Sequence, residues 1–116
     1  MKRVFFRIIL MIGCIVSFNT NAEQFRDTAG FMLPYCKETH RHDLSLAGAC
    51  MGTITTYWQF ADKLSEDAKS CPPGNLSRED LVGVVVRYME RNPTELDQLF
   101  IAVVVDAFQE QWPCAK

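Results

Sequence analysis

The chain has 116 residues, 48% of them hydrophobic and 22% charged, and its 12 basic and 14 acidic residues give a formal net charge of −2. Three of the basic residues, Lys2, Arg3 and Arg7, lie in an N-terminal segment that we expect to be removed; the other nine leave a net charge of −5. This acidic balance disfavours nucleic acid and anionic membrane surfaces as partners and suits a basic one. The 94 residues after position 22 fit one domain with one hydrophobic core.

The N-terminal segment has the pattern of a secretory signal. Its basic residues precede an apolar run over residues 8–18, and residues 19–22 end on Ala22 at the expected cleavage site. The run is too short to cross a bilayer, which needs about 20 residues, and this argues against an uncleaved anchor. Residues 11–14 also resemble the box cut in bacterial lipoproteins, with Cys14 lipidated, but the apolar residues after Cys14 favour ordinary cleavage. We predict a cleaved signal at residues 1–22 and an exported domain at 23–116.

The first two predicted helices lie between the signal and residue 64. Periodicity predicts a helix over residues 24–37, with Phe25 on its apolar face, although Gly30 and Pro34 weaken it. Asp43 is a candidate N-cap for a second helix. The apolar period of this second helix consists of Ala47, Cys50, Ile54, Tyr57, Ala61 and Leu64. It is the cleanest helical period in the chain.

Two further helices follow a clear break. Prolines and a glycine prevent a helix over residues 70–75, and Ser77 then caps a valine-rich helix that runs to about Arg91. Pro93 at a first helical position predicts a fourth helix, which stops at Trp112. Its predicted inward face consists of Leu96, Leu99, Phe100, Val103, Ala107 and Phe108. The fold class is all-α, a small bundle of about four helices.

Four cysteines remain after signal cleavage: Cys36, Cys50, Cys71 and Cys114. An exported chain meets an oxidising compartment, where paired cysteines persist as disulfides. In an up-down bundle, the turn flanked by Cys36 and Cys50 lies at one end, and Cys71 and Cys114 lie at the other. Only the pairing of Cys36 with Cys50 and of Cys71 with Cys114 avoids joining opposite ends. We therefore predict these two disulfides.

The sequence is poor in catalytic groups, so we predict a protein that is not an enzyme and needs no cofactor. Paired cysteines offer no free thiolate, and no phosphate-binding loop or nucleophile elbow occurs. The only histidines, His40 and His42, have no standard zinc spacing, and a polar turn is the simpler interpretation. Trp58 lies on a turn of the predicted second helix that is crowded with aromatic side chains, and these side chains cannot all face inward. It is either ordinary core or an aromatic anchor for a partner.

Several landmarks occur together in this order. They are a cysteine ending the first helix, the run 49–54, Cys-Pro-Pro-Gly at 71–74, a valine-rich helix ending in Asn92-Pro93, and Trp-Pro-Cys at 112–114. Together they resemble the Rap/Tai family of immunity proteins, which protect bacteria against peptidoglycan amidases delivered by type VI secretion. The resemblance covers about residues 33–114. It implies a periplasmic, helical, non-catalytic protein, commonly a homodimer, that occupies the cleft of a toxic amidase.

Two loops are candidates for contacting such an effector. Residues 65–75 form the longest segment between helices, carry Glu66, Asp67 and Asn75, and are pinned by Cys71. The turn from Arg91 to Glu95 is the alternative. A periplasmic chaperone of the acid-stress type remains a different functional class, although two disulfides would oppose acid-driven loosening. A binder of another periplasmic hydrolase, such as a lysozyme inhibitor, is a third interpretation.

Overall fold

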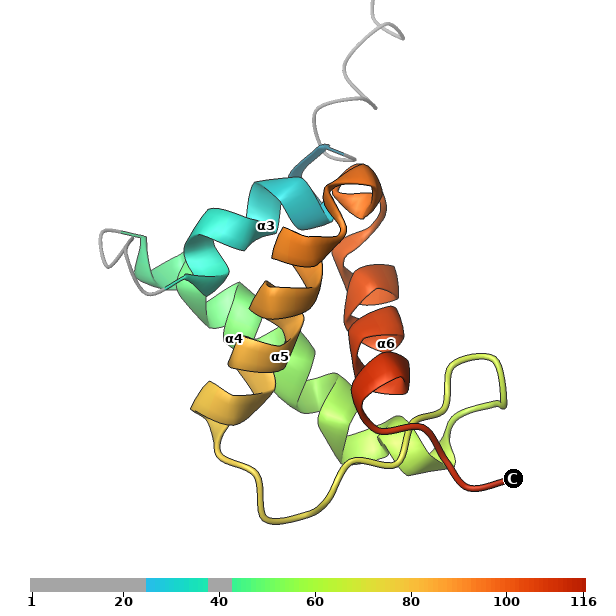
Figure 1. The fold of residues 1–116 in the computed structure, drawn as a ribbon. Coiled ribbons are helices and arrows are strands. Elements are labelled where there is room, and N and C mark those ends of the chain that lie inside the picture. Colours follow the sequence, from blue (N-terminus) through green and yellow to red (C-terminus); the bar gives the residue numbers. More distant parts are fainter. Residues whose placement is uncertain (1–24, 38–42) are drawn as a thin grey trace, which may run out of the picture.

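The structure is a computed structural model that describes residues 25–37 and 43–116 (Figure 1). Over these residues it contains four α-helices, two short 3₁₀ helices and no strand, which confirms the all-α prediction. The helices are α3 (Ala29–Cys36), α4 (Leu44–Phe60), η1 (Ala61–Lys63), α5 (Arg78–Arg91), η2 (Pro93–Glu95) and α6 (Phe100–Gln111). The predicted signal at residues 1–22 and the turn with His40 and His42 lie outside the described residues.

Helix α3 begins later than predicted because its first amides bond to another part of the chain. The Thr28 hydroxyl caps the helix by accepting from the Phe31 amide at 3.3 Å. The amides of Ala29 and Gly30 donate to the carbonyls of Gln98 and Leu96, at 2.9 and 2.8 Å. A Cβ on Gly30 would lie 3.0 Å from the Leu96 carbonyl oxygen, so glycine permits this close approach. Phe25, which we expected on the apolar face, is 63% exposed.

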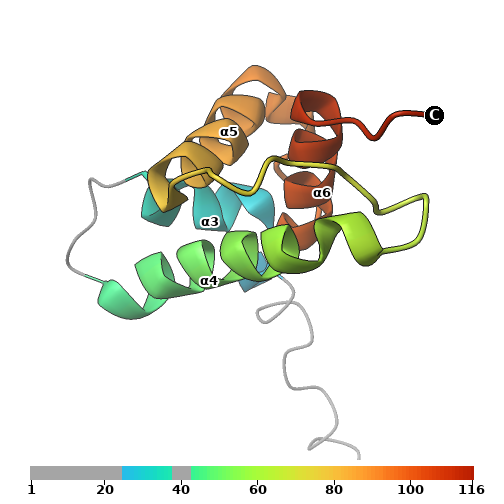
Figure 2. The ribbon, with the colours of Figure 1, turned by 90° about the horizontal axis from the view of Figure 1, so that it is seen from below.

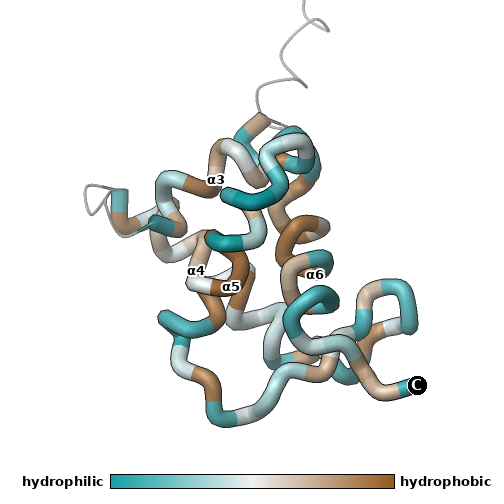
Figure 3. The backbone as a smooth tube through the Cα atoms, in the orientation of Figure 1, coloured by the Kyte–Doolittle hydropathy of each residue, from teal (hydrophilic) through white to brown (hydrophobic). Residues whose placement is uncertain are grey.

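Helices α4 and α5 begin at the caps that the sequence predicts. Asp43 accepts from the Leu46 amide at 3.1 Å at the start of α4. Ser77 and Asp80 form a reciprocal capping box at the start of α5, with bonds of 3.0 and 3.1 Å. Figure 3 shows hydrophilic residues at both ends of α5 and hydrophobic ones in its middle. Helix α4 ends at Phe60 and η1 follows, so Leu64 does not join the buried face.

The predicted start of the fourth helix at Pro93 is wrong. Only the 3₁₀ turn η2 forms there, and α6 begins at Phe100. The reason is competition for backbone groups: residues 96–100 bond to residues 27–30 around the start of α3, including a 2.7 Å bond from the Phe100 amide to the Asp27 carbonyl. An isolated bridge pairs Thr28 with Leu99. Leu99 is therefore half exposed, whereas we expected it in the core.

The helices surround one core but do not all run side by side. Helices α5 and α6 are antiparallel neighbours, while α4 lies across them, as Figures 1 and 2 show. The expected up-down arrangement is therefore only partly realised. Fully buried residues from three helices meet in the centre, with Ile54 from α4, Met89 from α5 and Phe108 from α6. Burying each such side chain contributes roughly 1.5–3 kcal/mol.

Both disulfides join the predicted pairs. Cys36 is bonded to Cys50 and Cys71 to Cys114, with Cα atoms 5.6 and 5.0 Å apart. The first links the end of α3 to the middle of α4. The second links the segment before α5 to the C-terminal segment after α6. The pairing holds although α4 crosses the other helices, because each pair depends only on which segments are neighbours.

Candidate functional site

The long segment between η1 and α5, residues 64–77, is held against the helices at several points. The Tyr57 hydroxyl donates to the Ala68 carbonyl at 2.8 Å and lies 3.0 Å from the Ser70 hydroxyl. The Cys71 amide donates to the Trp112 carbonyl at 2.8 Å, beside the disulfide to Cys114. The segment is therefore a fixed surface feature that offers a partner a preformed shape.

Helix α6 supports the same segment from its last turns. The side-chain amide of Gln109 donates to the carbonyls of Asp67 and Lys69, at 3.0 and 3.2 Å. Gln109 was not among the residues predicted from the sequence. One polar residue among several on this helix carries no signal for such a contact, because its partners are main-chain atoms about 40 residues away.

The predicted contact residues of this segment are exposed but differ in their surroundings. Glu66 exposes 92% of its side chain and lies 3.7 Å from Lys69. Asp67 accepts a hydrogen bond from the Ser65 hydroxyl, and this bond lowers the pKa of the Asp67 carboxyl. Asn75 is also exposed, beyond the disulfide anchor and close to the start of α5. The two acidic residues thus form one negative tip, and Asn75 lies apart from it along the segment.

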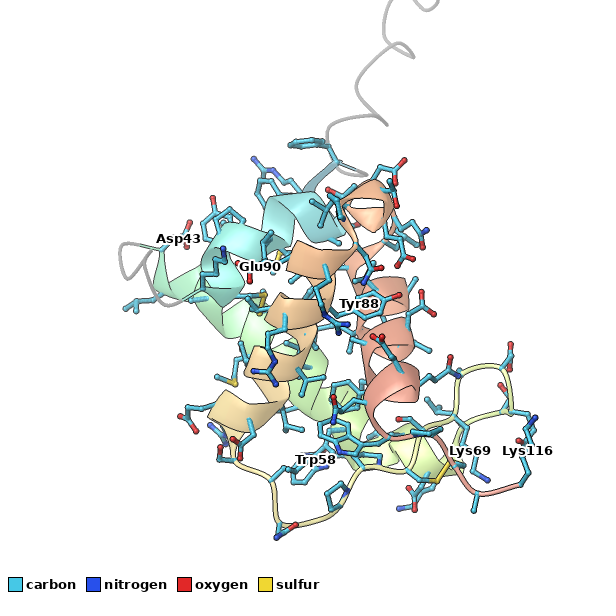
Figure 4. The ribbon with its side chains drawn as sticks, in the orientation of Figure 1. Asp43, Trp58, Lys69, Tyr88, Glu90 and Lys116 are labelled. Atoms are coloured by element: carbon cyan, nitrogen blue, oxygen red, sulfur yellow. A yellow bond between two sulfur atoms is a disulfide. The ribbon has the colours of Figure 1, made fainter. Side chains whose placement is uncertain are left out.

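Trp58 occupies an intermediate position between core and surface. It is partly buried against the core, and its indole nitrogen donates to the Pro73 carbonyl at 3.4 Å. With Pro72 and Gly74 it lines a shallow pocket of about 530 Å³. Figure 4 shows Trp58 at the same end of the molecule as Lys69. Trp58 therefore supports the segment and also presents an aromatic edge beside it.

The alternative turn lies at the other end of the molecule and is engaged internally. The Arg91 guanidinium bonds to the Glu110 carboxylate at 3.2 Å and ties α5 to α6. The Glu95 carboxylate accepts from the Tyr88 hydroxyl at 2.8 Å. Figure 4 shows Tyr88 near the middle of the molecule, above Trp58 and Lys69. Arg91 and Glu95 therefore already serve the fold through these bonds.

An acidic cluster between α5 and α6 was not predicted from the sequence. Burial, followed by the bond and charge of Glu95, raises the pKa of Tyr88 to about 12. Burial also raises the pKa of Asp106, and the negative charge of Glu95 adds to that effect. The residues come from two helices and a 3₁₀ turn, so their spacing in the sequence does not reveal that they meet.

The described residues include carboxylates and cysteines, which are common metal ligands and nucleophiles. Among them, no three side chains of histidine, cysteine, aspartate or glutamate are grouped as metal ligands would be. Cys36, Cys50, Cys71 and Cys114 are all consumed by disulfides and offer no thiolate. None of the helices in residues 25–37 and 43–116 combines the length and apolarity needed to cross a bilayer.

These features define a small disulfide-linked helical domain with rigid loops, a class suited to binding another protein. Residues 28–114 match the family model of the Rap1a immunity proteins. Because the match covers about three quarters of the chain, this protein belongs to that family. The match confirms the resemblance drawn from the cysteine, proline and tryptophan landmarks. No curated protein and no solved structure matches the chain significantly.

Proposed function

We propose that this protein is a periplasmic immunity protein that blocks a peptidoglycan amidase delivered by type VI secretion, and so protects the producing cell and its kin. The family match over residues 28–114 carries the proposal, since immunity proteins act by binding a toxin. The amidase as target follows from the resemblance to the Rap/Tai family. The role is inhibitory, by occupying the effector's cleft, with no chemistry performed by the immunity protein itself.

The segment of residues 64–77 is the proposed contact surface. Its bonds to Tyr57 and Gln109 and the Cys71–Cys114 disulfide fix its shape before binding. A segment that is already ordered loses little conformational entropy when it enters a cleft. Its acidic tip, Glu66 and Asp67, suits a basic rim around that cleft.

The proposed location rests on two observations. Residues 1–22 have the pattern of a cleaved secretory signal, and the domain contains two disulfides. Disulfides of this kind form and persist outside the reducing cytosol. The proposed mature protein is a homodimer with no nucleic-acid partner and no membrane attachment.

A protection experiment tests this proposal. Cells producing a periplasm-directed cognate amidase should survive when they also produce the full-length chain. A chain starting at Glu23 and retained in the cytosol should fail to protect them. The control is the chain starting at Glu23 fused to an unrelated secretory signal, and this fusion should restore protection. Full rescue by the cytosolic version would contradict the periplasmic role.

A further inference from the structure

The two disulfides differ in how far an attacking group can reach them. Cys36 is 6% exposed and Cys50 is 1% exposed, so the bond between them lies in the core. Cys71 is exposed and Cys114 is half-buried. A disulfide is reduced when a thiolate attacks one of its two sulfur atoms, and the rate depends on access to that atom. Of the two bonds, Cys71–Cys114 is therefore the one that a thiol on the surface of another protein can reach.

A shallow pocket provides the approach to this bond. It has a volume of about 530 Å³, and its lining consists of Trp58, Gln59, Asp62, Cys71, Pro72 and Gly74. Cys71 lines the pocket, whereas Cys114 does not. A Cβ atom added to Gly74 would meet nothing within 4 Å, so the space on that side of the pocket is open. A thiolate that enters the pocket meets Cys71, which leaves Cys114 as the departing thiolate.

The Cys71–Cys114 bond holds pieces of chain that have few other attachments. In the described structure, no hydrogen bond or ion pair joins residues 113–116 to the rest of the protein. Residues 72–75 keep one hydrogen bond, which the Trp58 indole donates to the Pro73 carbonyl at 3.4 Å. Breaking the disulfide would therefore release residues 113–116 and loosen residues 72–75.

The neighbouring part of the same segment is held independently of this disulfide. Tyr57 bonds to Ala68 and Ser70, and the Gln109 side chain donates to the carbonyls of Asp67 and Lys69. These bonds come from α4 and α6 and do not involve either cysteine. Reduction should therefore loosen only the half of the segment that contains residues 71–75 and leave the helices packed.

We propose that Cys71–Cys114 is a thiol-exchange site, at which a protein dithiol reduces this bond while Cys36–Cys50 stays intact. Exposed disulfides are the ones that take part in such exchange, whereas buried structural disulfides resist it. Because residues 64–77 are the proposed contact surface, reduction would lower the affinity for the effector. That consequence rests on the proposed function, but the exchange reaction itself does not.

The reaction is an exchange in two steps. A thiolate of the dithiol attacks the Cys71 sulfur, the Cys71–Cys114 bond breaks, and Cys114 leaves as a thiolate. The second thiolate of the dithiol then attacks its own partner sulfur in the mixed disulfide and releases Cys71. Two electrons pass from the dithiol to the two cysteines, and the two protons that the dithiol loses end on Cys71 and Cys114. The dithiol becomes a disulfide.

The test uses oxidised protein purified from the periplasm after expression of the full-length chain. It is incubated with thioredoxin, a protein dithiol, which is kept reduced by its reductase and NADPH. Free thiols are then alkylated and located by mass spectrometry. Cys71 and Cys114 should become alkylated at least about tenfold faster than Cys36 and Cys50. Equal rates for the two pairs, or a faster reaction of Cys36 and Cys50, would overturn the proposal.

Two further measurements locate the attack. A thioredoxin that lacks its second active-site cysteine should be trapped as a mixed disulfide on Cys71, and trapping on Cys114 would overturn the assigned order. Gly74→Phe covers the approach and should slow the reduction about fivefold. The matched control is Gly48→Phe, because Gly48 also has open space around it but lies on α4, away from this pocket. Equal rates for the two variants would overturn the pocket as the route.

Amidase binding by the oxidised and the selectively reduced, alkylated protein tests the consequence. Affinity should fall at least about tenfold on reduction, because the loosened residues must be ordered again on binding. Circular dichroism should show that the helices remain, and the Cys71→Ala, Cys114→Ala double variant should bind as weakly as the reduced protein. Equal binding by both forms would overturn the effect on the effector. If neither form binds the amidase, the proposed function fails while the thiol measurements still decide the exchange site.

Discussion

The Tyr57 hydroxyl lies 3.0 Å from the hydroxyl of Ser70, and Ser70 is the one fully buried polar residue of the described core. The same Tyr57 hydroxyl donates to the Ala68 carbonyl at 2.8 Å. Burial raises the pKa of Tyr57, so the phenol stays protonated and keeps donating at physiological pH. One side chain of α4 thus satisfies two polar groups of the segment that we propose as the binding surface.

Tyr57→Phe should therefore destabilise the domain by about 1–3 kcal/mol, because it leaves buried polar groups without their partner. The measurement is urea unfolding of the oxidised protein. Ser70→Ala should cost less, since Tyr57 keeps its bond to the Ala68 carbonyl. If Tyr57→Phe unfolds at the same urea concentration as wild type, the hydrogen bonds of this pair do not hold the segment.

Gln109→Ala should loosen residues 67–69 with a small effect on the whole domain. It removes two hydrogen bonds to main-chain carbonyls, each worth about 1 kcal/mol, at an exposed edge. Amide hydrogen exchange should accelerate in residues 65–70, and amidase affinity should fall. The matched control is Gln111→Ala, an exposed glutamine at the end of the same helix. Equal exchange rates in the two variants would contradict the supporting role of Gln109.

The sequence predicted the helices best where the signal is local. Caps at Asp43 and Ser77, and the proline-rich break at residues 70–75, depend on neighbouring residues, and all three are confirmed. The start of α6 was wrong because residues 96–100 bond to residues 27–30, about 70 positions earlier. Pro93 is an equally good start for a 3₁₀ turn and for an α-helix. Only the tertiary contact decides between them.

The two disulfides should contribute unequally to stability. The chain-entropy model assigns about 3 kcal/mol to the 14-residue separation of Cys36 and Cys50, and about 4 kcal/mol to the 43-residue separation of Cys71 and Cys114. Replacing both cysteines of each pair with alanine, followed by urea unfolding, measures these values. The Cys71–Cys114 variant should also lose amidase binding, because that bond anchors the segment. A larger loss of stability for the Cys36–Cys50 variant would contradict this ranking.

The candidate site was predicted only in part. The acidic segment and its disulfide were predicted, because the length, charge and cysteines of a segment can be read directly from the sequence. It did not indicate that Arg91 and Glu95 are already bonded to Glu110 and Tyr88, since those partners lie on other turns or helices. The unequal exposure of the two disulfides was also not predicted, because it depends on which elements cover each bond.

Asp106 should make the domain less stable at neutral pH than a neutral residue would. Burial and the charge of Glu95 raise the folded-state pKa of Asp106, so the folded protein binds a proton more readily than the unfolded chain. Stability therefore increases as the pH falls through the folded-state pKa toward the lower pKa of the unfolded chain. Asp106→Asn should raise the urea midpoint at pH 7, and its advantage should shrink in acid. The converse control is Asp80→Asn. Bonds from Ser77 lower the pKa of Asp80, so its stabilisation exists at neutral pH and is lost in acid.

The acidic tip and Asn75 should matter for binding and not for folding. Replacing Glu66, Asp67 and Asn75 together with alanine removes exposed side chains whose few contacts are at the surface. Amidase affinity, measured by calorimetry, should fall at least about tenfold, which corresponds to about 1.4 kcal/mol, while the melting temperature stays close to that of wild type. Replacing Thr94, Asp97 and Gln98 probes the opposite end without breaking the bonds of Arg91 and Glu95. If that second set weakens binding and the first does not, the effector contacts the turn between α5 and α6.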